Sequence, residues 1–166
     1  RINYINQEYY GNPSSIHKIG EKAAYILEDS RLTVASHLNT SVEKLVFTSG
    51  ATESIHLAIK GVTQNISPGR IVISAVEHPA VRLLALSLKQ YGWDVQYWPV
   101  DNCGNIKLDY IDKLLSKPTK IVSVIWGQSE IGTIQPIEII GNECRNQNPI
   151  WWQTRHRIYR LLHYLF

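Results

Sequence analysis

Strand-like segments alternate with helix-like segments along most of this chain, and this alternation limits the possible folds more than any other feature. Most of the strand-like segments are short apolar runs, and they are Leu45–Phe47, Ile71–Ala75, Trp93–Pro99 and Ile121–Trp126. Apolar residues at helical spacing occupy the segments Ile16–Leu38, Ala51–Val62, Pro79–Tyr91, Leu108–Leu115 and Pro136–Arg145. This order predicts an α/β fold, with a mostly parallel sheet flanked by helices on both faces.

Two helix ends carry local signals. The loop Asn12–Ser15 precedes the first long helix, and we expect Ser14 or Ser15 to be its N-cap. A serine hydroxyl at that position accepts a hydrogen bond from an N–H group of the first turn. The helix that starts at Ala51 is expected to close near Gly61, because glycine is common where helices end.

Composition excludes several classes of function. Of the 166 residues, 44% are hydrophobic and 19% charged, which is typical of a globular domain. The net charge of +3 comes from the last sixteen residues, so no general basic surface for nucleic acid is expected. Cys103 and Cys144 predict neither a disulfide framework nor a metal site. No apolar run approaches the length of a membrane span and no signal-peptide pattern is present, so we expect a cytoplasmic protein.

The composition changes near Pro149, where a segment rich in Trp and Arg begins. We therefore expect a domain over residues 1–148 and a separate tail over 149–166. In the tail, apolar residues at helical spacing allow a cationic amphipathic helix for a membrane surface or a partner; they are Ile158, Leu161, Leu162 and Leu165. A chance pattern in an out-of-frame sequence is the alternative.

The segment Phe47–Ser54, with the sequence FTSGATES, joins a predicted strand to a predicted helix. Free N–H groups at a helix N-terminus favour a phosphate, and hydroxyl groups can add hydrogen bonds. Gly50 permits a tight turn and a close approach of the backbone. The alternative is that these residues merely cap the helix. From the spacing alone, both interpretations stay open.

Two further polar loops follow predicted strands. Glu77-His78-Pro79 contains a histidine that could stack on an aromatic ring, act as an acid or base, or simply lie on the surface. Gln128–Gly132 is the other loop. In parallel sheets, ligands bind beyond the carboxyl ends of the strands. Three polar loops at this edge therefore predict a site for a small phosphorylated ligand.

These loops resemble those of the cysteine desulfurases, which belong to the class V aminotransferase group. Four motifs occur in the family's order: YGNPSSIH (Tyr10–His17), FTSGATES (Phe47–Ser54), EHPAV (Glu77–Val81) and SEIGTIQPI (Ser129–Ile137). The resemblance implies part of the large domain of a fold-type I transferase that uses pyridoxal 5'-phosphate. It also implies a reaction that takes sulfur from L-cysteine, leaving alanine and a persulfide on the enzyme, for iron-sulfur cluster assembly or other sulfur delivery.

The resemblance implies roles for individual residues. Ala51 and Thr52 match the contacts to the cofactor phosphate, with Gly50 making the turn, and His78 matches the histidine that packs over the pyridine ring. Ser129 replaces an asparagine that contacts the ring hydroxyl in the family. Two residues of the first motif match active-site architecture rather than reacting groups; they are Asn12 and His17.

Other parts of the family's machinery have no match here. The Schiff-base lysine and the carboxylate that faces the pyridinium nitrogen lie in later motifs, and none of the nine lysines is in a matching context. Neither Cys103 nor Cys144 matches the nucleophilic cysteine. The chain begins with Arg, contains no Met and lacks the family's opening motif. We therefore expect a truncated, frameshifted first third to half of the enzyme, catalytically incompetent as it stands.

Three alternatives remain at the level of sequence. The chain could be a non-enzymatic module that binds phosphorylated ligands through Ser49–Thr52, an inactive remnant, or another class V enzyme that uses pyridoxal phosphate. The resemblance implies a homodimer in intact relatives and a sulfur acceptor or iron-sulfur scaffold as a protein partner. No metal site, nucleic acid or membrane partner is expected.

Overall fold

The fold is described by a computed structural model that covers residues 2–147 and 149–155. These residues form two compact units, one before and one after the junction between Phe47 and Thr48. Within the described ranges, no helix is long and apolar enough to cross a membrane.

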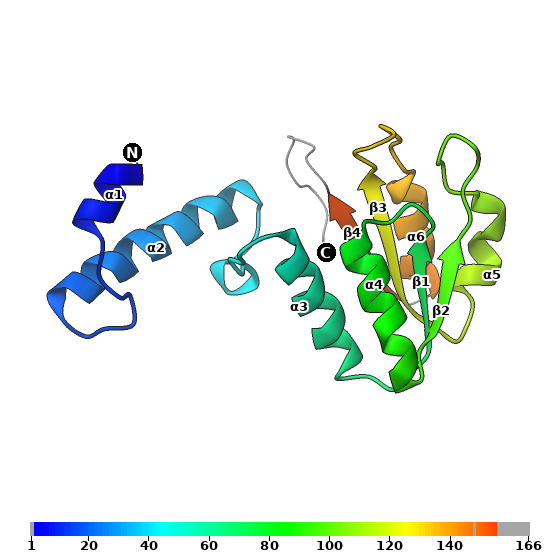
Figure 1. The fold of residues 1–166 in the computed structure, drawn as a ribbon, viewed down its shortest axis with the longest axis horizontal. Helices are drawn as coiled ribbons and strands as arrows, with labels where there is room; N and C mark the ends of the chain where they lie inside the picture. The colour runs from blue at the N-terminus through cyan, green and yellow to red at the C-terminus, as the bar shows by residue number, and fades with distance from the viewer. Residues whose placement is uncertain (1, 148, 156–166) are drawn as a thin grey trace. The chain divides into compact units, whose positions relative to one another are not determined.

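The second unit is built on a sheet of four parallel strands (Figure 1). The strands are β1 (Arg70–Ser74), β2 (Asp94–Trp98), β3 (Thr119–Gly127) and β4 (Ile150–Arg155). Their order across the sheet is β2-β1-β3-β4, and every neighbouring pair is parallel. The sheet confirms the predicted α/β fold.

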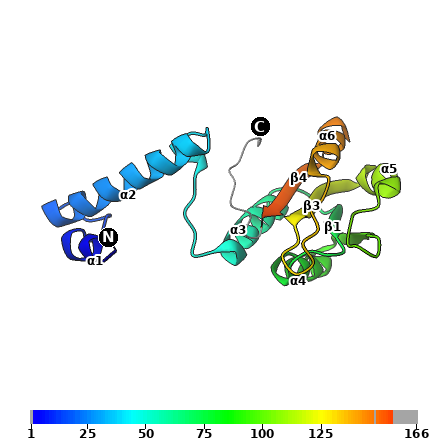
Figure 2. The ribbon, with the colours of Figure 1, turned by 90° about the horizontal axis from the view of Figure 1, so that it is seen from above.

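Helices cover both faces of this sheet (Figure 2). On one face lie α3 (Ala51–Thr63), α4 (Pro79–Ser87) and the short η2 (Leu88–Tyr91); on the other lie η3 (Leu108–Tyr110), α5 (Ile111–Leu115) and α6 (Ile137–Gln147). Because successive residues of a strand point to opposite faces, Ile71 and Ile73 pack with α3 and α4 while Val72 packs with α5 and α6. The predicted two-sided burial of the central strands therefore follows directly from their apolar runs.

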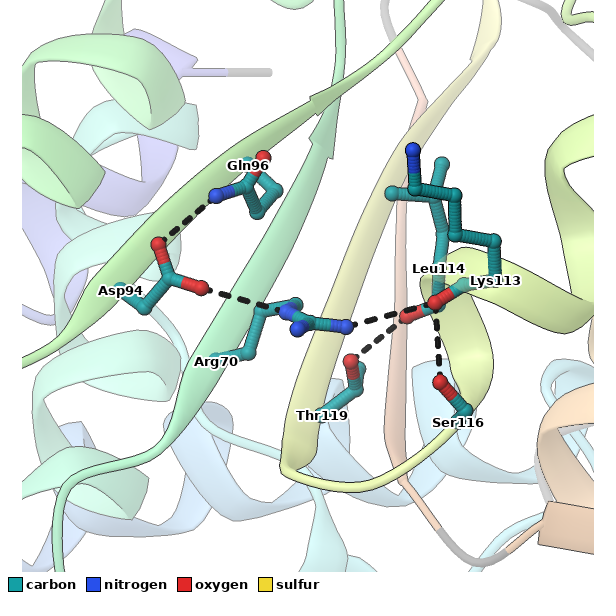
Figure 3. Close-up of polar contacts among 7 residues, drawn as sticks. All are labelled: Arg70, Asp94, Gln96, Lys113, Leu114, Ser116 and Thr119. Atoms are coloured by element: carbon teal, nitrogen blue, oxygen red, sulfur yellow. Dashed lines mark hydrogen bonds and ion pairs between the residues drawn. The ribbon is translucent and has the colours of Figure 1, made fainter.

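A polar network joins the strands to α5 at the amino end of the sheet (Figure 3). Arg70 forms an ion pair with Asp94 at 3.2 Å and donates to the carbonyl of Lys113. The buried Thr119 hydroxyl donates to the carbonyl of Leu114 at 2.6 Å. These bonds satisfy carbonyls at the end of α5 that have no partner within the helix. The network is a structural support, and it lies at the end of the sheet opposite the three polar loops.

The first unit contains α1 (Ile2–Glu8), α2 (Lys18–His37) and the short η1 (Val42–Lys44). The predicted serine N-cap of α2 is wrong, because the N-cap is His17, whose Nδ1 accepts from the N–H of Gly20 at 3.2 Å. Ser14 is instead part of the preceding turn, where its N–H donates to the Asn12 side chain.

One other sequence prediction also needs correction. Leu45–Phe47 is not a strand; the exposed fractions of Val46 and Phe47 are 61% and 45%, and no described strand pairs with this segment. An apolar run becomes a strand only where a neighbour supplies backbone partners. Helix α3 ends at Thr63, one residue beyond the predicted end at Val62, so the predicted closure near Gly61 is confirmed.

Strand β4 was not predicted, because Ile150 lies in the segment that composition separates as a tail. Its pairing with β3 joins Ile121 to Ile150 and continues to Gly127 and Arg155. Its apolar and aromatic start, Ile-Trp-Trp, was the available signal for a strand. The segment Ile158–Leu165, for which the sequence allowed either an amphipathic helix or a chance pattern, lies outside the described residues.

Candidate functional site

The site is assembled where the parallel strands end. Helix α3 leads into β1 and α4 follows it, and both pack on the same face of the sheet. Both helices therefore run opposite to the strands, and their N-termini lie at the carboxyl edge of the sheet (Figure 1). The loops after β1 and β3 meet this edge as well, because these strands are neighbours. The three predicted loops thus belong to one edge, with two helix N-termini directed toward it.

The corner before α3 is held by local hydrogen bonds. The Thr48 hydroxyl lies 2.6 Å from the Ser54 hydroxyl and 3.2 Å from the carbonyl oxygen of Gly50. The Glu53 carboxylate accepts from the N–H of Ser49 at 2.6 Å. These hydrogen bonds with Ser49 lower the pKa of Glu53 below its usual value. The hydrogen bonds that hold the corner are therefore made by the side chains of Thr48, Ser54 and Glu53, and Thr52 takes no part in them.

Donors for an anion remain at this helix end. Gly50 is the N-cap of α3 and has no side chain to cap the first turn. The first bond of the helix runs from the Ser54 N–H to the Gly50 carbonyl, so the helix itself cannot satisfy the N–H groups of Ala51, Thr52 and Glu53. Within the described structure, the Thr52 hydroxyl makes no hydrogen bond, and this side chain is exposed. The donor set is that of an anion site.

Gly50 contributes space rather than a special backbone conformation. Its φ of 167° and ψ of −178° are extended values that any residue can adopt, and the chain bends at Ser49 and Gly50 directly before α3. A Cβ atom added to Gly50 would meet nothing within 4 Å. The backbone at the corner is consequently open to an approaching ligand.

His78 begins α4 as its N-cap. Its Nδ1 accepts from the N–H of Ala80 at 3.1 Å, and Pro79 takes the first helical position. The lone pair of Nδ1 is therefore occupied, and the neutral ring carries its proton on Nε2. This bond fixes the orientation of the imidazole, which is partly buried.

A buried polar pair lies beneath this loop. Glu77 is 8% exposed and its carboxylate accepts from the hydroxyl of Ser123, which is fully buried on β3, at 3.1 Å. Ser74, at the end of β1, has a buried hydroxyl with no hydrogen-bond partner among the described residues. No sequence pattern indicated a role for these three side chains. A charged residue at the end of an apolar strand, beside the motif histidine, was the signal for Glu77.

Ser129 lies exposed in the loop that follows β3. Gln128 shapes this loop, since its side-chain oxygen accepts from the N–H groups of Glu130 at 2.5 Å and Ile131 at 3.2 Å. Gly132 has a φ of +74°, a left-handed conformation that favours glycine. The loop is a closed turn that presents Ser129 at the carboxyl edge.

Two cavities lie away from this edge. One of about 490 Å³ is near the amino ends of the strands and is lined in part by Lys60, Tyr91 and Trp93. The other, of about 510 Å³, is in the first unit and is lined in part by Tyr9 and Tyr25. Cavity size alone therefore does not identify the site. In the described part of the chain, no group of three His, Cys, Asp or Glu residues could hold a metal ion.

Residues 2–152 match the Aminotransferase class-V family, which covers most of the chain. The chain belongs to the class V aminotransferase family. The match includes all three loops at the carboxyl edge and reaches into β4. Members of this family use pyridoxal 5'-phosphate, whose phosphate group fits the donors at the start of α3 and the open space beside Gly50.

Within this family, curated relatives are named as cysteine desulfurases. The chain is 40% identical over 135 residues to cysteine desulfurase IscS 1 of Archaeoglobus fulgidus, covering 80% of this chain and 35% of the relative. It is 39% identical over 134 residues to cysteine desulfurase IscS of Dictyoglomus turgidum, covering 80% of this chain and 34% of the relative. The chain thus spans about a third of the length of these class V relatives.

Solved structures of class V proteins share the fold. A NifS-like protein is 33% identical, with a TM-score of 0.87, and the match covers 96% of this chain and 44% of that protein. SspA in complex with cysteine is 30% identical, with a TM-score of 0.82, and the match covers 90% of this chain and 44% of SspA.

Proposed function

We propose that this chain forms the cofactor-phosphate side of a pyridoxal-phosphate-dependent cysteine desulfurase. The observation that carries the proposal is the start of α3, where unsatisfied N–H groups, a free Thr52 hydroxyl and the open space at Gly50 meet. The family match and the names of the curated relatives support it. When bound, the cofactor supplies an electron sink for chemistry at the amino acid.

The phosphate is held by Ala51 and Thr52 in this proposal. Their N–H groups donate to it, the Thr52 hydroxyl adds a third bond, and the positive end of the α3 dipole favours its charge. The Glu53 carboxylate keeps its hydrogen bond to the Ser49 N–H within the same corner.

His78 packs over the cofactor ring in this proposal. Its Nδ1 is already bonded to the Ala80 N–H, so the neutral imidazole carries its proton on Nε2 and can present a ring face. Accepting a proton would require the bond to Ala80 to open. The helix cap therefore favours the stacking role over the role of a base, the two alternatives that the sequence left open.

Ser129 takes the place of the family's asparagine near the ring hydroxyl. Its side chain is shorter than that of asparagine, so the contact depends on how closely the loop after β3 approaches the cofactor. No residue among the 166 matches the Schiff-base lysine or the nucleophilic cysteine of the family. For these 166 residues alone, we expect cofactor binding without release of sulfur from L-cysteine.

L-cysteine is the proposed substrate of the whole enzyme, and a sulfur acceptor or iron-sulfur scaffold is its proposed protein partner. The relatives' names and the resemblance of the motifs support this assignment. A homodimer is proposed on the resemblance alone, and a cytoplasmic location on the sequence pattern. The division between a domain over 1–148 and a tail over 149–166 is proposed on the change of composition near Pro149, and β4 joins the start of that tail to the sheet.

Binding of pyridoxal phosphate to the 166-residue chain tests the proposal. We expect the Thr52→Val variant to lose about 1.5–3 kcal/mol of binding free energy, because a hydrogen bond to a charged group is removed while the shape is nearly kept. Unfolding stability should hardly change, since the Thr52 hydroxyl has no partner within the described protein. The measurements are equilibrium dialysis with the cofactor and thermal unfolding.

Thr63→Val is the matched control, because Thr63 ends the same helix and its hydroxyl bonds only to the carbonyl of Lys60 in the described structure. It should leave cofactor affinity unchanged. Equal affinity for wild type and Thr52→Val would contradict the proposal. Displacement of the cofactor by inorganic phosphate alone, with no preference for the pyridine ring, would favour the non-enzymatic phosphate-binding module instead.

A further inference from the structure

A buried amide side chain ties the loop after β3 to the turn after β2. Gln135 is 2% exposed and stands at the end of the loop Gln128–Gln135. Its Nε2 donates to the carbonyl of Gly104 at 2.6 Å, and its Oε1 accepts from the N–H of Ile106 at 2.9 Å. Both ends of the amide are therefore bonded to backbone groups about thirty residues earlier in the chain.

Two more contacts join the same two segments. The Thr133 hydroxyl donates to the carbonyl of Cys103 at 2.6 Å. The side chain of Ile131 packs so closely on Gly104 that a Cβ atom added there would collide with it. Gly104 also has a φ of +80°, and this left-handed conformation is the reason that a glycine is favoured at this point.

The turn after β2 is a firm support. The carboxylate of Asp101 accepts from the N–H of Cys103 at 2.8 Å and from that of Asn105 at 2.9 Å. The N–H of Asp101 donates in turn to the carbonyl of Asn105 at 2.8 Å. Hydrogen bonding, chiefly with Asn105, lowers the pKa of Asp101, so its charged form is favoured in the folded turn.

Other backbone hydrogen bonds of the Gln128–Gln135 loop lie within the loop or join it to β3. The Gln128 N–H donates to the carbonyl of Thr133, the Gly132 N–H donates to that of Gln128, and the Gln135 N–H donates to that of Trp126 on β3. None of these three bonds reaches the turn after β2. Sideways restraint on the loop therefore comes from the bonds of Gln135 and Thr133 and from the packing of Ile131.

We infer that Gln135 is a positioning residue that holds the Gln128–Gly132 loop, and with it Ser129, against the Asp101–Ile106 turn. This step rests on the proposed function, in which Ser129 contacts the cofactor. The hydrogen bonds of Gln135 would then set the distance between Ser129 and the cofactor. Gln135 would then act on the cofactor through the loop, from a buried position that touches neither the phosphate nor the ring.

Gln135→Leu tests the inference, because leucine is similar in size and removes both hydrogen bonds. In the 166-residue chain without cofactor, we expect hydrogen exchange at the N–H groups of residues 130–132 to become about tenfold faster or more. Cofactor affinity, measured by dialysis, should fall severalfold. Thr119→Val is the control, since it removes a buried side-chain hydrogen bond at the opposite end of the same sheet.

The exchange measurement decides the inference without the cofactor. Faster exchange at residues 130–132 in Gln135→Leu, but not in Thr119→Val, supports it; unchanged exchange in both variants overturns it. If wild type fails to bind the cofactor, the proposed function is contradicted, and the exchange rates still decide whether Gln135 positions the loop.

Two further variants keep the test usable if Gln135→Leu does not fold. Thr133→Val removes only the third hydrogen bond and should give a smaller effect at the same N–H groups. Gln135→Glu can restore the two hydrogen bonds at low pH. A protonated carboxyl group can donate to the Gly104 carbonyl and accept from the Ile106 N–H, whereas a carboxylate cannot donate. Relative to wild type at the same pH, exchange should be faster at high pH and should return to the wild-type rate at low pH. An effect that does not depend on pH would contradict the role of these two bonds.

Discussion

Two histidines in the recognised motifs have the same local task. His17 and His78 each begin a helix, and each uses Nδ1 to accept from an N–H group of the first turn. Both bonds require an unprotonated Nδ1, so both imidazoles are oriented by the backbone of the helix that they cap. At the level of single residues, the position of a helix start thus determines which nitrogen of each ring bonds to the backbone.

Glu53 gives a prediction for pH dependence. Its pKa is lowered from 4.5 by hydrogen bonds with Ser49, so the carboxylate stabilises the fold above pH 4.5, and this contribution is lost as pH falls through the lower folded-state pKa. We expect Glu53→Gln to be less stable than wild type at pH 7, with a smaller difference at pH 3. Urea unfolding of both proteins at pH 7 and at pH 3 measures this difference in stability. An equal difference at the two values would contradict the prediction.

The two cysteines should differ sharply in reactivity. Burial raises the pKa of Cys144 to about 12, while Cys103 is exposed. At pH 8 only about one Cys144 thiol in ten thousand is ionised, and the thiolate is the reactive form. We expect iodoacetamide to label Cys103 alone in the folded chain and both cysteines in urea, as measured by mass spectrometry. Early labelling of Cys144 would show that α6 is not packed as described.

At the scale of elements, the arrangement of α3, β1 and α4 creates the candidate site. Both helices pack on the same face and run opposite to β1, so two helix N-termini reach one edge of the sheet. The loop after β3 meets them there because β3 is the neighbour of β1. The order of the strands therefore brings together segments that are far apart in the chain.

Two glycines in these elements should respond oppositely to alanine. Gly132 has a φ of +74°, so Gly132→Ala should destabilise the fold by about 1–2 kcal/mol. Gly61 lies inside α3 and a Cβ there would meet nothing within 4 Å, so Gly61→Ala should stabilise it by about 0.5–1 kcal/mol. Urea unfolding of the two variants tests both signs. Equal effects would contradict the assigned backbone conformations.

At the scale of the whole molecule, burial is unevenly distributed. Both hydrophobic clusters of the described residues belong to the second unit. In the first unit, the buried residues of the long helix α2 are small: Gly20, Ala23 and Ala35. Large side chains of this unit are exposed, among them Ile16 at 96% and Tyr25 at 71%. Most of the hydrophobic stabilisation of the described chain therefore comes from the second unit.

This uneven burial predicts the order of proteolysis. We expect limited trypsin to cut first in the unit before Thr48, because its helices bury little surface, and a fragment that begins at Leu45, after the exposed Lys44, should accumulate. Mass spectrometry of the fragments over time measures this order. Initial cleavage at Lys120, inside β3, would contradict the predicted order. In the control, digestion of the heat-unfolded chain should cut both units at similar rates.

Much of the fold could be predicted from local patterns. The apolar runs of β1 and β3 predict strands buried on both faces, and the spacing of apolar residues in α3 and α4 predicts helices that pack against them. These patterns are informative because the face of a helix or strand that packs in the core carries apolar side chains at the period of that element. The motifs around Gly50, His78 and Ser129 likewise indicated one edge of the sheet, since the carboxyl ends of parallel strands share it.

Other features depended on partners that are distant in sequence. Leu45–Phe47 has the composition of a strand, but no described strand pairs with it, whereas Ile150–Arg155 is a strand because β3 accepts it. The role of Gln135 depends on Gly104 and Ile106, which local periodicity does not connect to it. The sequence by itself determined which segments are suited to be helices or strands. Only the tertiary structure decided which backbone groups find partners, because a hydrogen bond between distant residues forms only once the chain has brought them together.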